Sequence, residues 1–291
     1  MRHIKTYQVF EASASAALTA EQKIWLDECA EGTWALNPQT GLVDVKGSFN
    51  CSQQSLTDFR GVKFGVVDGY FYCYDNQLTS LVGAPQEVGG GFYCNVNRLD
   101  SLEGAPQKVG IDFYCYDNAL TSLVGAPQEV GHDFDCMNNQ LTSLVGAPQR
   151  VGRDLDCRRN ALTSLVGAPQ VINGSFDCGY NALASLDGAP HKVDGDFYCY
   201  NNHLISLEGA PLKVGMNFYY EANPVSEETL DAIFAKMQKN TSYLAAVESL
   251  WSKIPQDDQV LLYADDFKWV SPEQSRGIVA LRAYQGLRGM L

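Results

Sequence analysis

The sequence predicts an α/β solenoid with one long parallel β-sheet, non-helical return legs and a helical C-terminal cap. Seven cysteines recur every 21 residues from Cys73 to Cys199, and Cys51 precedes them by 22. The residues around each cysteine repeat with the same period, and the unit that starts at Phe113 reads FYCYDNALTSLVGAPQEVGHD. Such a fixed period is typical of stacked-repeat proteins, in which a unit buries its apolar side only against its neighbours.

Composition limits the classes of protein that the chain can belong to. Of its 291 residues, 45% are hydrophobic and 19% are charged, which is close to the globular average, so we expect a folded chain. No apolar run approaches the roughly 18 to 20 residues that span a bilayer, so we expect no membrane-spanning segment. Gln8 and Glu11 interrupt any signal-peptide core, so we expect none. The net charge of −13 argues against a nucleic-acid partner, because phosphate binding depends on clustered Lys and Arg.

Residues 1–48 are expected to cap the N-terminal end of the array, because end coils otherwise expose apolar surface. A helix is predicted over residues 18–29, with Thr19 as its N-cap and Gln22 completing a capping box. A hairpin is predicted over residues 34–45, with its turn in the segment NPQTG.

Residues 49–223 are expected to form the repeat array. It opens with a degenerate unit, continues through seven full units from Phe71 to Asn217, and closes with a truncated unit. In each unit Phe and Cys lie two residues apart, so both side chains point to the inner side of a strand. An Asn ends the strand, two leucines turn inward, and Gly-Ala-Pro prevents a helix on the return leg. A valine then closes the coil.

Stacking places equivalent residues above one another at roughly the 4.8 Å spacing of parallel strands. The asparagines are therefore expected to form a ladder of hydrogen bonds to the backbone of neighbouring coils.

A disulfide needs Cβ atoms roughly 3.8 Å apart, so we expect free thiols that pack as small apolar residues. The four histidines are scattered and no Cys-x-x-Cys pair exists, so no metal site is predicted. Reduced cysteines in this number favour a reducing, cytoplasmic location.

The repeat resembles a known family. Its segment F-x-C-x-x-N-x-L-x-x-L resembles the leucine-rich-repeat consensus L-x-L-x-x-N-x-L-x-x-L, and N-x-L-T-S-L-x-x-x-P is similar to short repeats of bacterial effector proteins. The resemblance covers residues 49–223 and implies a leucine-rich-repeat solenoid. Some of those effectors carry a ubiquitin-ligase domain after the repeats. Only 68 residues follow the array here and none is a cysteine, so we do not expect that activity.

Residues 224–291 are expected to form the helical C-terminal cap. Ser226 is a plausible N-cap for a helix that carries Leu230 and Phe234 on one side. The segment Ser271–Gln274 has the pattern of a second capping box, with Pro at the first helical position. These helices either only cap the last coil or also dock a partner.

The outward positions of the strands carry the candidate site. The array holds 10 basic and 19 acidic residues, a net of −9, and Tyr and Arg are favoured at protein interfaces. A partner-binding face for a protein, possibly a basic one, is therefore predicted. The simpler interpretation is that tyrosines suit strands and aspartates keep the sheet soluble. The predicted partner-binding residues are Tyr72, Tyr74, Tyr93, Tyr114, Tyr116, Asp133, Asp135, Asp154, Asp156, Arg158, Asp177, Tyr198 and Tyr200.

Catalytic chemistry is not expected. No nucleophile elbow, P-loop, dinucleotide fingerprint or zinc-protease motif occurs, so we predict no enzyme and no cofactor. Calcium could neutralise the aspartates, but a flat strand cannot wrap an ion. Carboxylate pairs such as Asp133 and Asp135 could serve a glycosidase, but they lie on an open sheet without an evident pocket.

Three functions remain, with the oligomeric state open. The first is a non-enzymatic protein–protein interaction module. The second is a structural component of a larger assembly, such as a bacteriophage virion, because the repeats and the opening I-K-T-Y-x-x-F-E resemble those of large-phage proteins. In that case the location would be the virion. The third is a glycan-binding adhesin, which the buried thiols and the missing export signal disfavour.

Overall fold

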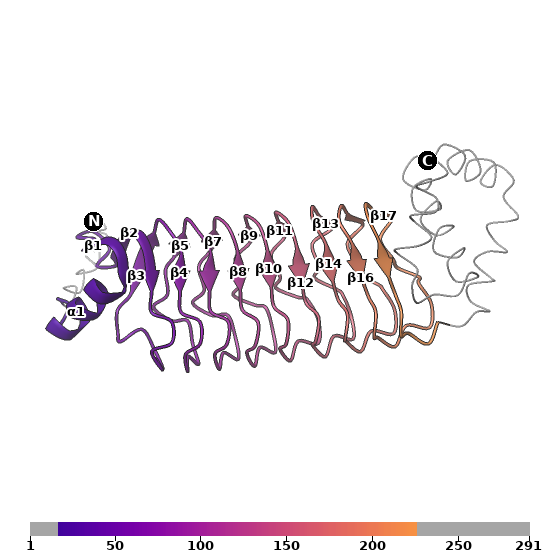
Figure 1. Cartoon of the computed structure of the whole chain (residues 1–291), viewed down its shortest axis with the longest axis horizontal. Coiled ribbons are helices and arrows are strands. Elements are labelled where there is room, and N and C mark those ends of the chain that lie inside the picture. The colour runs from indigo at the N-terminus through magenta and orange to yellow at the C-terminus, as the bar shows by residue number, and fades with distance from the viewer. Residues whose placement is uncertain (1–16, 226–291) are drawn as a thin grey trace, which may run out of the picture.

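The computed structural model describes residues 17–225. The chain winds into a parallel β-solenoid of about eight turns, whose coils stack along one axis (Figure 1). Each coil contributes two short strands, and equivalent strands of successive coils pair side by side. The predicted fold class is therefore confirmed: there is one long parallel sheet, and the return legs hold no helix in the described coils.

The first row of strands, called here the Phe row, contains the Phe-x-Cys segments. Phenylalanine pairs with phenylalanine from coil to coil, except in β12, where Leu155 takes that place. The inward phenylalanines and cysteines are almost completely buried. All nine cysteines are buried and free, as predicted. The strands are β4 (Phe71–Tyr72), β6 (Phe92–Tyr93), β8 (Phe113–Tyr114), β10 (Phe134–Asp135), β12 (Leu155–Asp156), β14 (Phe176–Asp177), β16 (Phe197–Tyr198) and β18 (Phe218–Tyr219).

The second row, called the Val row, lies on the return legs and was not predicted. Each of its later strands is two residues long, with one outward side chain and one inward Val or Ile. Both rows begin in one strand, because β2 (Val43–Asn50) pairs with β3 through its first half and with β4 through its second. The row contains β3 (Phe64–Val67), β5 (Glu87–Val88), β7 (Lys108–Val109), β9 (Glu129–Val130), β11 (Arg150–Val151), β13 (Val171–Ile172), β15 (Lys192–Val193) and β17 (Lys213–Val214).

The Val row is interrupted between β11 and β13, at the coil where Asn173 interrupts a column of glycines. At Gly131 and Gly152 an added Cβ would overlap the carbonyl oxygen of the preceding coil, so only glycine permits this approach. The next residue of the column is Asn173, which carries a side chain. From there β13, β15 and β17 form a separate three-stranded sheet.

The predicted asparagine ladder is present. Asn97 Nδ2 donates to the carbonyl oxygens of Cys73 (3.0 Å) and Cys94 (3.1 Å), and its Oδ1 accepts from the amide of Leu78 at 3.0 Å. One side chain therefore satisfies backbone groups of two coils. The residue before each ladder asparagine has a positive φ between 51° and 55°, even where it is Val96.

The N-terminal end of the solenoid is covered by α1 (Ala20–Cys29), the one helix of the described chain. Its predicted capping box is present between Thr19 and Gln22. Trp25 packs edge-on against Phe49, with ring centroids 5.3 Å apart. No helix within the described residues has the length and apolar character to cross a membrane.

The predicted hairpin is also present but longer than expected. β1 (Ala30–Leu36) pairs antiparallel with β2 along its whole length, and β2 continues into the first coil. Gln54 stands where later coils have the ladder asparagine. It accepts from Trp25 Nε1 at 2.9 Å and lies 3.2 Å from Cys29 Sγ, so the ladder ends on the cap helix. The predicted helical cap after residue 225 lies outside the described residues.

Candidate functional site

The thirteen predicted residues all lie on the outward side of the Phe row, and all are partly exposed. Three columns of side chains form this surface: the residue before Phe, the residue between Phe and Cys, and the residue after Cys. We call it the Tyr/Asp face. It runs along the solenoid axis, since every coil adds one residue to each column (Figure 1).

Tyrosines gather at both ends of the Tyr/Asp face. The rings of Tyr72 and Tyr93 stack with centroids 5.2 Å apart and planes 6° apart, and those of Tyr198 and Tyr219 with 4.7 Å and 4°. In these two pairs, stacking along the axis covers the ring faces that meet and leaves ring edges and hydroxyl groups for a ligand. The N-terminal tyrosine group comprises Tyr70, Tyr72, Tyr74, Tyr93, Tyr114 and Tyr116. The C-terminal tyrosine group comprises Tyr198, Tyr200 and Tyr219.

Three aspartates replace the tyrosines in the middle of the face. Asp135, Asp156 and Asp177 pair in register across β10, β12 and β14, and we call them the carboxylate row. Each accepts, through Oδ1, the amide two residues further on, at 2.9 to 3.0 Å. The carboxylates are thereby held in place over their own strands.

Burial raises the pKa of these carboxyl groups. The pKa of Asp135 rises to about 6, chiefly by desolvation. That of Asp156 rises to about 7 by desolvation and by the charges of Asp135 and Asp177 on either side. Desolvation also raises the pKa of Asp177.

Arg158 is the cation that contacts this row. Its Nε lies 2.9 Å from Asp156 Oδ2 and its Nη1 3.7 Å from Asp177 Oδ2. The Nε contact lacks hydrogen-bond geometry, and Nε is the one buried side-chain nitrogen or oxygen without a hydrogen-bond partner in residues 17–225. Asp135 forms no ion pair with another described residue. The row of three carboxylates therefore contacts one cation, which pairs with Asp156 and Asp177.

Asp133 and Asp154 also have a structural role that the sequence analysis did not predict. Asp133 Oδ1 accepts from the amide of Asp154 at 3.1 Å, and Asp154 Oδ1 accepts from the amide of Ser175 at 2.7 Å. These side chains thus join consecutive coils, as the asparagines do. The available signal was the run of short acceptors, Asp, Ser and Asn, at this one repeat position.

Sequence reasoning did not single out two further aromatic residues, one on the face and one at its border. Tyr70 stacks on Tyr72 at 5.7 Å. Tyr180 lies edge-on to Tyr200 at 5.3 Å, and the guanidinium of Arg159 lies 5.3 Å from its ring centroid. Tyr180 comes just before a ladder asparagine, outside the three columns, which explains why the repeat pattern did not single it out.

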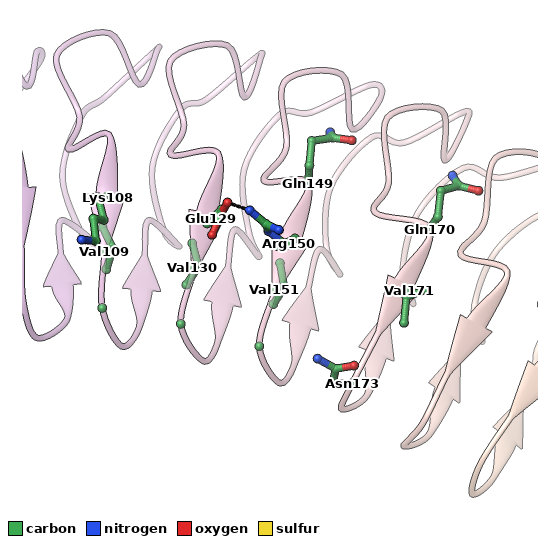
Figure 2. Close-up of a pocket in the computed structure, with 13 residues that line it drawn as sticks. Lys108, Val109, Glu129, Val130, Gln149, Arg150, Val151, Gln170, Val171 and Asn173 are labelled. Carbon is green, nitrogen blue, oxygen red and sulfur yellow. Dashed lines mark ion pairs between the residues drawn. The ribbon is translucent and has the colours of Figure 1, made fainter.

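A hollow of about 690 Å³ lies along the Val row (Figure 2). Outward charges alternate there from Lys108 through Glu129 to Arg150, and Glu129 forms an ion pair with Arg150. Because neighbouring charges neutralise one another, this surface offers less to a charged partner than the Tyr/Asp face does.

Residues 17–225 contain neither a cluster of metal ligands nor a thiol with a lowered pKa. No group of three or more His, Cys, Asp or Glu side chains there is arranged to hold a metal ion. Burial raises the pKa of the Cys115 and Cys136 thiols well above the usual value, which disfavours the nucleophilic thiolate. No protein-family model matches this sequence, and no curated protein matches it.

Proposed function

We propose that this chain is a non-enzymatic binding module of the leucine-rich-repeat type, which binds a basic segment of a protein partner along the Tyr/Asp face. The repeat pattern and the ladder asparagines that bridge successive coils support this type of repeat. The proposal assigns binding to the outward face of the Phe row, because its charges are less balanced than those of the Val row.

One observation carries the proposal: a row of partly buried carboxylates with one shared cation lies between two tyrosine groups. A carboxylate in a low-dielectric environment gains more from a cation than a fully exposed one does. Tyrosine edges and hydroxyl groups on both sides add contact area and directed hydrogen bonds. A partner surface that carries Lys or Arg can pair with the carboxylates and also contact the tyrosines.

The other two functions receive less support from the geometry. Sugar rings pack on exposed aromatic faces, and the stacking of Tyr72 on Tyr93 covers such faces. A subunit of a larger assembly would use the same face against a neighbouring protein. Analytical ultracentrifugation of the purified chain with its captured partner would distinguish a discrete complex from a large particle.

Affinity capture with matched variants tests the proposal. The face variant carries Asp135→Asn, Asp156→Asn and Asp177→Asn, which keeps the local amide acceptors and removes three charges. The control variant carries Glu87→Gln, Glu103→Gln and Glu208→Gln, at exposed positions away from the face. We expect the wild type and the control to capture the same basic partner and the face variant to lose it. Equal capture by both variants would contradict the proposal.

A further inference from the structure

We infer that the partner segment on the Tyr/Asp face is an α-helix that lies along the solenoid axis and presents one Lys or Arg per turn to the carboxylate row. This inference rests on the proposed function and adds the secondary structure and the residue spacing of the partner.

The spacing of the coils carries the inference. Equivalent tyrosine rings of neighbouring coils lie between 4.7 and 5.2 Å apart along the face. An α-helix rises about 5.4 Å per turn, so a stripe at i, i+4 and i+7 meets three successive coils. A β-strand places same-side residues roughly 6.6 to 6.8 Å apart and falls out of step within two coils. A polyproline helix repeats at about 9.3 Å and passes over every second coil.

The width of the face also suits a helix. Its three columns are two residues apart on each strand, so the face is roughly 13 Å wide. A helix with its side chains is about 10–12 Å across. Aspartates are shorter than tyrosines, so the middle of the face leaves more room for long Lys or Arg side chains than its two ends.

The charges determine what the stripe must carry. When all three carboxylates are ionised, Arg158 leaves them with two negative charges, so a helix that neutralises the row needs two cations over it. Tyr114 lies one coil before the carboxylate row, and Tyr198 lies one coil after it. Apolar side chains at those turns of the helix would pack against ring edges. The complete stripe is therefore apolar, cationic over three turns, and apolar again.

Synthetic peptides test this directly on the full chain. The striped peptide is an Ala-based helix with Lys at i, i+4 and i+7 and Leu one turn beyond each end. The scrambled peptide has the same composition, with its lysines on different sides of the helix. The extended peptide has Lys at i, i+2 and i+4 and prolines that prevent a helix.

Isothermal titration should show the striped peptide binding at least about tenfold more tightly than the other two. The face variant should lose that preference, and the Glu-to-Gln control should keep it. Arg158→Gln should tighten binding of the striped peptide, because it removes the competing cation. Circular dichroism of the bound peptide provides the second readout.

Two results would overturn the inference, and they have different consequences. If the extended peptide binds most tightly and the face variant abolishes this binding, the helix is wrong and the proposed function stands. If no peptide distinguishes the face variant from the control, both the helix and the proposed function fail.

Discussion

Single side chains bridge the coils of this solenoid. Asn139 donates to the carbonyl oxygens of Cys115 and Cys136, both at 3.1 Å, and the amide of Leu120 donates to it at 3.0 Å. Without it, the amide of Leu120 at the edge of the apolar core loses this acceptor, and each carbonyl oxygen keeps only the neighbouring ladder asparagine, Asn118 or Asn160. Such a loss costs more than the net value of a hydrogen bond, because desolvation is no longer offset.

Asn139→Ala should therefore destabilise the protein by about 2–4 kcal/mol. Urea unfolding followed by circular dichroism measures this change. Gln140→Ala, at the adjacent exposed position, is the matched control and should stay within about 0.5 kcal/mol of the wild type. Equal, small effects of both substitutions would show that the ladder contributes little.

Backbone strain at Val96 gives a prediction of opposite sign. Its φ of 55° is costly for a β-branched residue, whereas other coils have Asn138 or Asn201 at this position. Val96→Asn should stabilise the chain by about 0.5–1 kcal/mol in thermal unfolding. Val124→Asn replaces an exposed valine without a positive φ and should give no gain. A similar gain from both would show that replacing an exposed valine by a polar side chain, and not relief of backbone strain, is the cause.

At the scale of an element, the carboxylate row gives stability a pH dependence. The folded pKa of Asp135 is about 6 and that of Asp156 about 7, both above the usual value. The folded state therefore holds protons that the unfolded state has released, and this stability is lost as pH rises through the folded pKa values. The charges facing these groups are Asp117, Asp133, Asp177 and Arg158.

The Tm of the wild type should consequently fall between pH 5 and pH 8 by more than that of the Asp135→Asn/Asp156→Asn variant. After allowance for partial exposure, we expect a difference of about 2–4 °C, or roughly 1 kcal/mol. Differential scanning fluorimetry in one buffer series measures it. Parallel pH profiles for the two proteins would show that both carboxylates titrate normally.

The sequence was sufficient to predict the Phe row, its buried Phe and Cys side chains, and the capping box at Thr19. Each follows from the period or from chemistry within a few residues. The Val row was not predicted, because a two-residue strand with one inward residue gives no alternation to detect. Its break falls at the coil where Asn173 replaces a glycine, and the repeat pattern alone did not predict that position.

The site was predicted as a surface but not as a set of interactions. Its thirteen residues share the outward face because of strand alternation. The backbone hydrogen bonds of Asp133 and the sharing of Arg158 between two carboxylates depend on neighbouring coils. The repeat is enough to predict which column a side chain belongs to. It does not predict which of the stacked neighbours that side chain pairs with.

At the scale of the whole molecule, coils contact mainly their nearest neighbours, and the sum of these contacts holds a continuous core from Trp25 to Phe218. The same arrangement converts a 21-residue period into a row of regularly spaced coils along one axis (Figure 1). The protein thus presents a row of charges between aromatic ends, over a length that no single coil provides.

The central claim is that a partner binds the Tyr/Asp face, and hydroxyl-radical footprinting of the captured complex tests it most directly. The account predicts that Tyr93, Tyr114 and Tyr198 lose labelling in the complex, while the exposed return-leg residues His191 and Leu212 keep theirs. Unchanged labelling of those tyrosines, with protection of His191 and Leu212, would contradict it.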